Sequence, residues 1–320
     1  MSKRYSGWKW DFSRMLTRRK ADINFLLRGH ILNPLWHSRE RRRHQRFDAV
    51  VGFMEENLNL SLPDIASFRP AAVDNPGPEP ERVFTIWLQG EESAPDIVKS
   101  CFSQMRKVLG MEVVVLDEKT LFDWIKLPDY VIDGWKSGKM CAAHFSDICR
   151  VELLYQHGGV WLDSTDFVIS RVPQQIMDCD FFVYMAGQKI SSWYGYIQNC
   201  FIRAKKGNPL LGLWREAILT QWKRVPKAVD YFQHQVMFKK LVHENSQAAA
   251  LFKDMPKIDQ DPTHSLWFGY GNEPYEEARY KELASVAFFT KTTYKSKMAK
   301  SPLPGSIAEY MSSRYKSGTE

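Results

Sequence analysis

The residues best suited to chemistry lie within one short stretch, residues 144–166. Asp147 and Arg150 are three positions apart in a predicted helix, so their side chains share one helix face; alone, this spacing also fits an ordinary ion pair. Asp163-Ser-Thr-Asp166 places several oxygen atoms directly after an apolar run. Such oxygens suit Mn²⁺ or Mg²⁺, which stabilise a diphosphate leaving group. In isolation, the tetrapeptide is also typical of a turn or helix cap.

The elements that position these groups follow from the periodicity around them. Residues 142–157 are predicted to be helical because apolar side chains recur along one face. Gly158 stands where helices commonly end in a left-handed conformation. Gly158-Gly159 then leads into the short strand Val160–Leu162, which ends at Asp163. The order of helix, glycine stop, strand and acidic turn is far more specific than its parts.

The segment before this stretch has the pattern of a mainly parallel α/β sheet. Residues 82–88 and 112–117 have strand composition, and residues 94–109 between them have helical periodicity. Ligands of such sheets bind beyond the carboxyl ends of the strands, where we expect Trp87 and Asp117. Residues 181–184 are predicted to form a core strand.

The chain of 320 residues, 44% of them hydrophobic, can bury a full core. Three prolines and a glycine in residues 74–80 indicate a linker or a long loop. We therefore predict a basic helical extension over 1–78, an α/β domain over 79–300 and a C-terminal tail over 301–320. The lysine-rich segment 291–300 is expected to be exposed, and His157, His234 and His243 are expected to be structural.

The net charge of +7 is concentrated at one end, because thirteen Lys and Arg but only three acidic residues lie within 1–46. The sequence contains five cysteines without a Cys-x-x-Cys pair, and it lacks both a secretory signal and a run of about 18 apolar residues. This composition favours a cytoplasmic protein. The basic segment 1–46 is compatible with docking on an anionic inner leaflet, with a solvated helical cap or, as a third choice, with an organellar transit peptide.

Three motifs follow one another in this part of the chain: Phe145-Ser-Asp-x-x-Arg150, Leu153-Leu-Tyr155 and Gly158-Gly-Val-Trp-Leu-Asp-Ser-Thr165. Together they resemble the DXD sugar-binding region of the capsular polysaccharide synthesis family, which is related to glycosyltransferase family 32 and, more distantly, to the glucosylating domain of large clostridial toxins. The resemblance covers residues 82–295, with no counterpart for 1–78. It implies a GT-A fold and the use of a UDP- or GDP-sugar with a divalent metal.

The resemblance also implies roles for individual residues. Trp87 occupies the position of a tryptophan that packs on the nucleobase, although a core tryptophan is the alternative. Asp147 and Arg150 take the place of groups that contact the donor sugar and its phosphate-linked side, and Gly159 of the same motif is assigned to the donor site. Asp163 is the expected metal ligand. Catalysis is therefore expected to depend on Asp147, Arg150 and Asp163.

The second metal ligand stays open, because Thr165 stands where a strict motif has a second aspartate. Either Thr165 or Asp166 can serve. Later in the chain, residues 264–267 resemble the lid that closes over the diphosphate in these transferases. This gives Ser265 and Trp267 a role in donor binding and makes His264 a candidate metal or phosphate ligand; the alternative is a surface loop with one buried aromatic.

The expected function is transfer of a hexose, with retention of configuration, from a nucleotide-sugar to a saccharide or lipid-linked saccharide of capsule, lipopolysaccharide or another surface glycan. Two other classes stay open. A catalytically silent glycan-binding protein would keep the fold without turnover. A nucleic-acid-binding protein would explain the basic N-terminal segment, but it would leave the pattern from Asp147 to Asp166 unexplained.

Overall fold

The computed structural model describes residues 52, 56, 67–68, 82–186, 196–228 and 231–317. The chain divides into two compact units, Met1–Ala49 and Val50–Glu320. The predicted basic extension 1–78 and its boundary at 78/79 therefore lie almost wholly outside the described residues. All elements below belong to the second unit.

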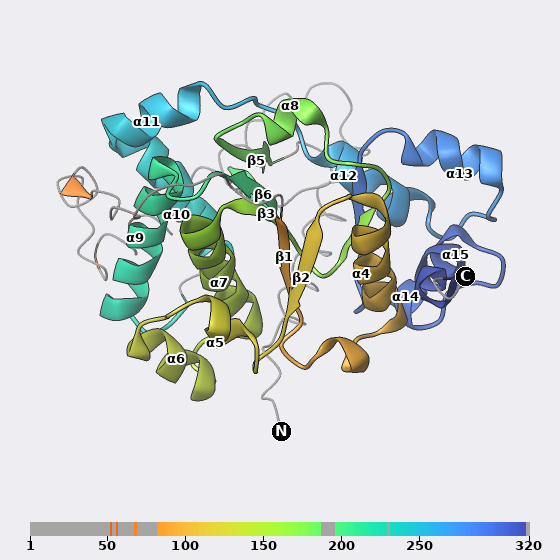
Figure 1. Ribbon diagram of the computed structural model, residues 1–320, viewed down its shortest axis with the longest axis horizontal. Coiled ribbons are helices and arrows are strands. Elements are labelled where there is room, and N and C mark those ends of the chain that lie inside the picture. Colours follow the sequence, from red (N-terminus) through yellow and green to blue (C-terminus); the bar gives the residue numbers. More distant parts are fainter. Residues whose placement is uncertain are drawn as a thin grey trace, which may run out of the picture. The chain divides into compact units, whose positions relative to one another are not determined.

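A five-stranded sheet with the order β2-β1-β3-β6-β5 forms the centre of this unit (Figure 1). β1 (Arg82–Ile86) pairs in parallel with β2 (Glu112–Leu116) and with β3 (Gly159–Leu162), whereas β6 (Ile197–Ala204) runs antiparallel to both β3 and β5 (Phe181–Met185). Four of the five strands thus share one direction. The predicted α/β class with a mainly parallel sheet is confirmed.

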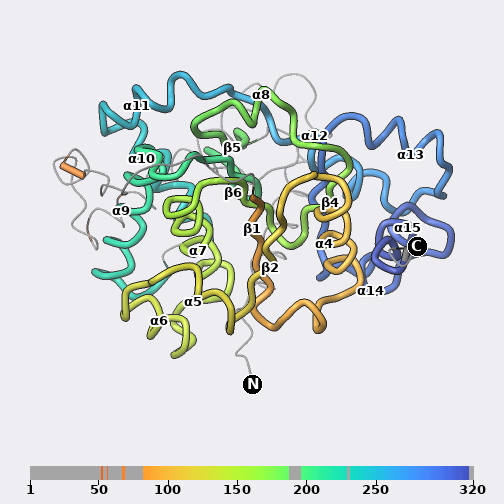
Figure 2. The backbone as a smooth tube through the Cα atoms, viewed as in Figure 1, coloured from red at the N-terminus to blue at the C-terminus, as the bar shows by residue number. Residues whose placement is uncertain are grey.

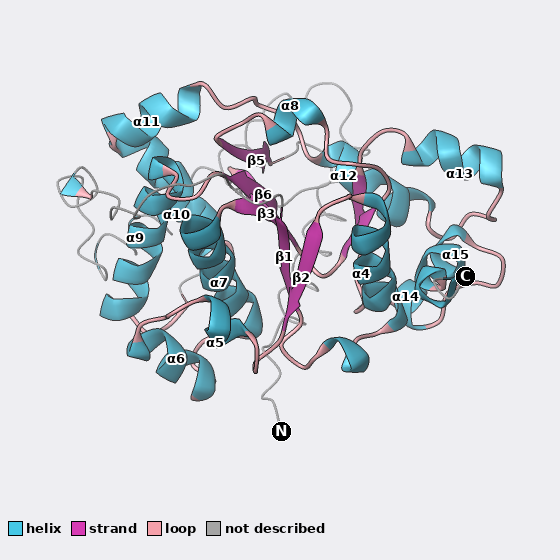
Figure 3. Cartoon of the chain, in the orientation of Figure 1, coloured by secondary structure: helices cyan, strands magenta, loops and turns pink. Residues whose placement is uncertain are grey.

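Helices cover both faces of this sheet (Figure 3). α4 (Asp96–Val108) is the crossover between β1 and β2, and it also contacts the small sheet made by β4 (Asp166–Val168) and β7 (Phe289–Lys291). α7 (Ala142–His157) contacts β1, β3 and β6, and it packs against α9 (Pro209–Arg224). The other helices and helical turns are α5 (Leu121–Trp124), α6 (Asp129–Lys136), α8 (Gln174–Met177), α10 (Gln233–Glu244), α11 (Ser246–Lys253), α12 (Asp261–Ser265), α13 (Glu277–Ala284), α14 (Lys297–Lys300), α15 (Ile307–Ser312), η2 (Glu91–Ser93), η3 (Leu266–Tyr270) and η4 (Arg314–Ser317).

The glycine pair after α7 is required by the backbone. Gly158 ends the helix at φ 68° and ψ −170°, which is not the left-handed helical conformation we expected but one that is essentially restricted to glycine. Gly159 has φ 101°, and a Cβ there would lie 2.5 Å from the carbonyl oxygen of Arg82 in β1. Gly159 is not among the residues that line the cavity beyond β1 and β3. The close approach of two strands by itself requires glycine here, and the assignment of Gly159 to the donor site stays a prediction.

The predicted C-terminal tail is folded up to residue 317. In α15 the side chains of Ile307, Ala308 and Met311 are fully buried, and the helix packs on α4 (Figure 2). The Ser100 hydroxyl in α4 donates a hydrogen bond of 2.9 Å to the carbonyl oxygen of Ser312. This segment therefore belongs to the same core as the sheet. No helix among the described residues is long and apolar enough to cross a membrane.

Candidate active site

A cavity of about 520 Å³ opens beyond the carboxyl ends of β1 and β3. Its volume lies within the range of small-molecule sites. Seven regions of the chain meet in its wall: the end of β1, α7, the end of β3 with the turn after it, β6, the start of α10, α12 and the segment from the end of β7 onward. The wall includes Trp87, Ser146, Asp147, Arg150, Asp163, Thr165, Asn199, Tyr231, Gln235, His264, Lys291, Tyr294 and Lys295. Asp117 is not among them; its carboxylate accepts hydrogen bonds from the backbone of Lys119 and Thr120.

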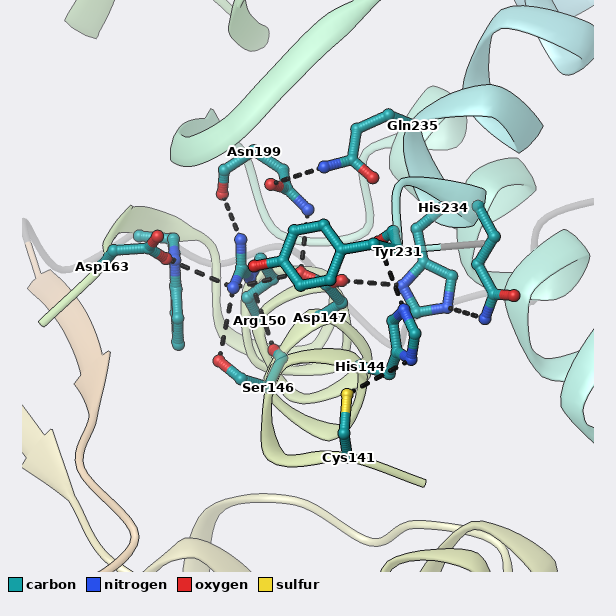
Figure 4. Close-up of polar contacts among 12 residues, drawn as sticks. Cys141, His144, Ser146, Asp147, Arg150, Asp163, Asn199, Tyr231, His234 and Gln235 are labelled. Carbon is teal, nitrogen blue, oxygen red and sulfur yellow. Dashed lines mark hydrogen bonds and ion pairs between the residues drawn. The ribbon is translucent and has the colours of Figure 1, made fainter. Parts of the chain in front are cut away.

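Arg150 is the centre of the polar network (Figure 4). Its Nη2 lies 3.1 Å from Oδ1 of Asp147 and 3.2 Å from Oδ1 of Asp163, and its Nη1 donates a 2.5 Å hydrogen bond to the carbonyl oxygen of Asn199. The guanidinium carbon lies 4.9 Å from the centre of the Trp161 ring. One planar cation thus fixes two carboxylates relative to each other, and it confirms the predicted proximity of Asp147 and Arg150.

Asp147 is held from two further sides. Nδ2 of Asn199 donates a 2.9 Å hydrogen bond to Oδ1, and Nδ1 of His234 lies 3.2 Å from Oδ2. The indole N–H of Trp222 donates to Nε2 of His234, and because an indole can only donate, Nε2 must be the acceptor. The neutral ring therefore carries its proton on Nδ1, facing Asp147. His234 is thus a positioning residue for the cavity as well as a core histidine.

Burial sets the charge states of this pair. Burial lowers the pKa of His234, which keeps the ring neutral near pH 7. Burial would raise the pKa of Asp147, but Arg150 and then His234 outweigh it and leave that pKa below its usual value. Asp147 is therefore an anion that three protein groups hold in the wall of the cavity.

Asp163 and Asp166 share a cation that we expected to be exposed. Nζ of Lys291 lies 2.5 Å from Oδ2 of Asp163 and 3.1 Å from Oδ1 of Asp166, and the lysine side chain is only 18% exposed. Trp161 Nε1 also donates a 2.9 Å hydrogen bond to Asp163. The pKa of Asp166 is raised to about 7, mainly by burial. The positive charge of Lys291 lowers this pKa, and the negative charge of Asp163 raises it. For Asp163, Arg150 and Lys291 outweigh burial and lower the pKa.

The sequence predicted that these groups bind a divalent cation, with Thr165 or Asp166 as the second ligand. Among the described residues, no cluster of three or more His, Cys, Asp or Glu side chains has the arrangement of a metal site. One oxygen of Asp166 accepts a 3.1 Å hydrogen bond from the backbone N–H of Asp163, and the other faces Lys291. Thr165 lines the cavity beside Asp163. The donor set does not fit Mn²⁺ or Mg²⁺, since an ammonium group already bridges the two carboxylates.

The predicted lid residues are separated by the structure. His264 lines the cavity, its Nδ1 lies 2.9 Å from the Thr263 hydroxyl, and burial, followed by Lys291, lowers its pKa to about 4. Ser265 donates its hydroxyl hydrogen to the carbonyl oxygen of Pro262, and Trp267 is fully buried. Neither Ser265 nor Trp267 lines the cavity, so in this structure Trp267 is a core residue.

Trp87 lines the same cavity from the end of β1. Its ring meets that of Tyr294 edge to face, with centroids 5.2 Å apart, and it is half-buried. The indole nitrogen has no hydrogen-bond partner among the described residues. This aromatic pair lies at the end of β1, where we expected the nucleobase to pack.

Comparison with known proteins agrees with this geometry. The profile of the capsular polysaccharide synthesis protein family matches residues 35–310. The chain belongs to this family. The match begins before residue 82, so the family resemblance extends further toward the N-terminus than the motifs indicated. The relation to glycosyltransferase family 32 stays a prediction.

The individual relatives of the chain are distant. The chain is 25% identical over 173 residues to O-glycosyltransferase braB of Annulohypoxylon truncatum, which is 49% of this chain and 41% of that protein. It is 27% identical over 128 residues to glycosyltransferase afumC of Aspergillus fumigatus, covering 37% and 32%. The matches thus span less than half of either relative. Among solved structures, the PaToxG glycosyltransferase is similar over 86% of this chain and 96% of that chain, with 14% identity and a TM-score of 0.39.

Some side chains of the site could not be predicted from the sequence of this chain. Lys291 lies 125 positions from Asp166, and only the pairing of β4 with β7 brings them together. Asn199 and Tyr231 also line the cavity, but no local pattern in the sequence indicated that either lies beside α7. Gln235 donates a 3.1 Å hydrogen bond to Asn199, so it supports Asp147 indirectly.

Proposed function

We propose that the cavity binds a nucleotide-sugar, with a UDP-sugar favoured, and that the protein transfers the hexose to a hydroxyl group of a saccharide acceptor. The observation that carries the proposal is the arrangement of the cavity wall. An aromatic pair, Trp87 and Tyr294, lies at the end of β1, and a cluster of paired charges lies at the end of β3. A nucleotide-sugar has the same order of an aromatic base followed by a charged diphosphate and a polar sugar.

The residues have distinct parts in this proposal. Trp87 stacks on the base, since base–aromatic stacking is favourable for every base. Arg150 and Lys291 face the diphosphate. Asp147 accepts hydrogen bonds from sugar hydroxyls, because a fixed anion in the cavity wall suits hydroxyl donors. Rate enhancement then comes from positioning and from stabilisation of the leaving group. The anomeric outcome, expected to be retention, is part of the proposal.

The acceptor is proposed from the family and its relatives. A surface glycan of capsule or lipopolysaccharide type, free or lipid-linked, agrees with the family description, and the name O-glycosyltransferase of a relative agrees with transfer to an oxygen atom. Action at the inner face of a membrane through residues 1–46 remains a proposal, and these residues lie outside the described part of the chain.

The test is a screen of UDP-, GDP- and CMP-sugars for thermal stabilisation and for slow hydrolysis without acceptor. Trp87→Ala should weaken UDP binding by about 1–3 kcal/mol. Trp124→Ala is a matched control, because Trp124 packs on Phe84 outside the cavity. Equal affinities for UDP in the two variants would contradict the base site.

The silent-scaffold alternative predicts glycan binding without hydrolysis of any sugar nucleotide, so the same screen separates it from an enzyme. A nucleic-acid-binding protein predicts affinity that falls steeply with salt and does not respond to sugar nucleotides. The cavity favours neither alternative, because its charged groups are mostly paired with one another and include two carboxylates, Asp147 and Asp163.

A further inference from the structure

Strand pairing holds Lys291 beside Asp163 and Asp166, the two carboxylates that a divalent cation would bind. In the antiparallel pair of β4 and β7, Lys291 stands directly opposite Asp166. Its Nζ reaches across to Asp166 at 3.1 Å and to Asp163 at 2.5 Å. Opposite charges at paired positions of neighbouring strands are within contact distance by geometry. The ion pair is therefore part of the strand register.

This ammonium group also faces the cavity. Lys291 lines the cavity together with Asp163 and Lys295, and Nζ of Lys295 lies 5.5 Å from the ring centroid of Tyr294. One segment thus carries a lysine at the charge cluster and a second lysine beside the aromatic pair. Both ammonium groups are available to a diphosphate that joins a base on Trp87 to a sugar near Asp147.

The alternative cation finds too few ligands here. Mn²⁺ and Mg²⁺ take several oxygen ligands, but both oxygens of Asp166 are engaged by Lys291 and by the backbone N–H of Asp163. A divalent ion would also have to displace the ammonium that neutralises the two carboxylates.

We propose that the ammonium group of Lys291, assisted by Lys295, takes the place of a divalent metal and stabilises the diphosphate leaving group in a metal-independent transfer. The inference rests on the proposed function. In the transfer, the bond between the anomeric carbon and the diphosphate oxygen breaks, and its electron pair stays on the diphosphate next to Lys291. The acceptor oxygen bonds to the anomeric carbon, and its proton passes to the diphosphate. No further reactant is required.

The first experiment measures UDP binding by titration calorimetry in EDTA and in Mn²⁺, with GDP in parallel. Wild-type protein should bind one of the two with affinities that agree within about twofold in the two buffers. Binding that strengthens tenfold or more with Mn²⁺ would overturn the inference but leave the proposed function standing. Binding of neither nucleotide in either buffer would overturn both.

The second experiment asks whether Lys291 contacts phosphate or only neutralises its neighbours. Lys291→Met should weaken the binding of UDP by about ten- to a hundredfold in EDTA, as expected for a lost charged hydrogen bond. The affinity for uridine should stay almost unchanged. Lys291→Arg should retain most of the preference for UDP over uridine. Lys297→Met removes the same charge from an exposed position outside the cavity and should have no effect.

Loss of folding in the single variant would not leave the question open. The double variant Lys291→Met with Asp166→Asn removes one charge of each sign and so avoids an unpaired buried carboxylate. In this background the preference for UDP over uridine should also be lost, whereas Asp166→Asn alone should keep it. An unchanged preference in the double variant would show that Lys291 has only a structural role.

Discussion

The central role of Arg150 can be tested by removing its guanidinium. In Arg150→Met, the carboxylates of Asp147 and Asp163 lose their shared cation in a buried position. Breaking a buried ion pair by removing one partner costs about 3–5 kcal/mol. Asp163 keeps Lys291 and Trp161, and Asp147 keeps Asn199. We therefore expect a loss near the lower limit, about 3 kcal/mol.

Urea unfolding followed by tryptophan fluorescence measures this loss, since the chain has 11 tryptophans. A loss of about 3 kcal/mol corresponds to a fall in melting temperature of about 6–12 °C for a domain of this size. Arg150→Lys should lie between wild type and Arg150→Met, because it retains a charge but loses the planar fork that contacts Asn199 and both carboxylates.

Arg106→Met is the matched control. Arg106 makes a two-fold contact with the carboxylate of Glu91 at 2.6 and 2.7 Å, but the two side chains are 47% and 33% exposed, so solvent screens the pair. Exposed pairs contribute at most about 1 kcal/mol. If Arg150→Met were no more destabilising than Arg106→Met, the cluster would be screened by solvent, and the reasoning about burial would be wrong.

Two further predictions concern the backbone and the histidine behind the site. Gly159→Ala should destabilise the protein by about 2 kcal/mol or more, because its Cβ would meet the Arg82 carbonyl oxygen, whereas Gly138→Ala, with positive φ but open space, should cost less in the same urea assay. Because the pKa of His234 is lowered on folding, its neutral form adds stability above the unfolded pKa of about 6.5 that is lost as pH falls below it. Wild type should therefore lose more stability than His234→Gln between pH 7 and 5; equal slopes would contradict a buried neutral ring.

The sequence predicted the elements of the site well because local periodicity specifies them. Helix 142–157 has the predicted bounds, and the strands at residues 82 and 112 end within two residues of the predicted positions. Asp147, Arg150 and Asp163 were identified because they lie on one helix face and at one strand end. Each of these relations spans few residues, so spacing alone reveals it.

The relations that were missed join segments far apart in the chain. The bridge from Lys291 to Asp163 and Asp166 depends on the pairing of β4 with β7, which no local pattern specifies. The same holds for His234, whose contact with Asp147 depends on the packing of both α7 and α10 against α9. Trp267 was placed in a lid by a motif of four residues, but its burial is decided by the surrounding core. Local spacing indicated which groups were available, and tertiary pairing decided their partners.

The pairing of Asp163 leads to a prediction that separates its two possible roles. The resemblance assigns Asp163 to a metal. In the structure, however, its carboxylate forms ion pairs with Arg150 and Lys291, the two cations that a diphosphate would approach. A diphosphate must then compete with Asp163 for both. Asp163→Asn keeps an oxygen that can accept from Trp161 and removes the competing charge.

If Asp163 acts only as a counter-ion, Asp163→Asn should bind UDP several-fold more tightly than wild type in EDTA, because two cations become more available to phosphate. Calorimetry with UDP and with uridine separates this effect from a change at the base, since uridine should bind both proteins alike. Weaker UDP binding by Asp163→Asn would refute the competition and show that the carboxylate itself contacts the donor. Both metal-free transfer and the competition between Asp163 and a diphosphate require Lys291 to be available to phosphate. The direction in which Asp163→Asn changes the affinity for UDP therefore bears on both.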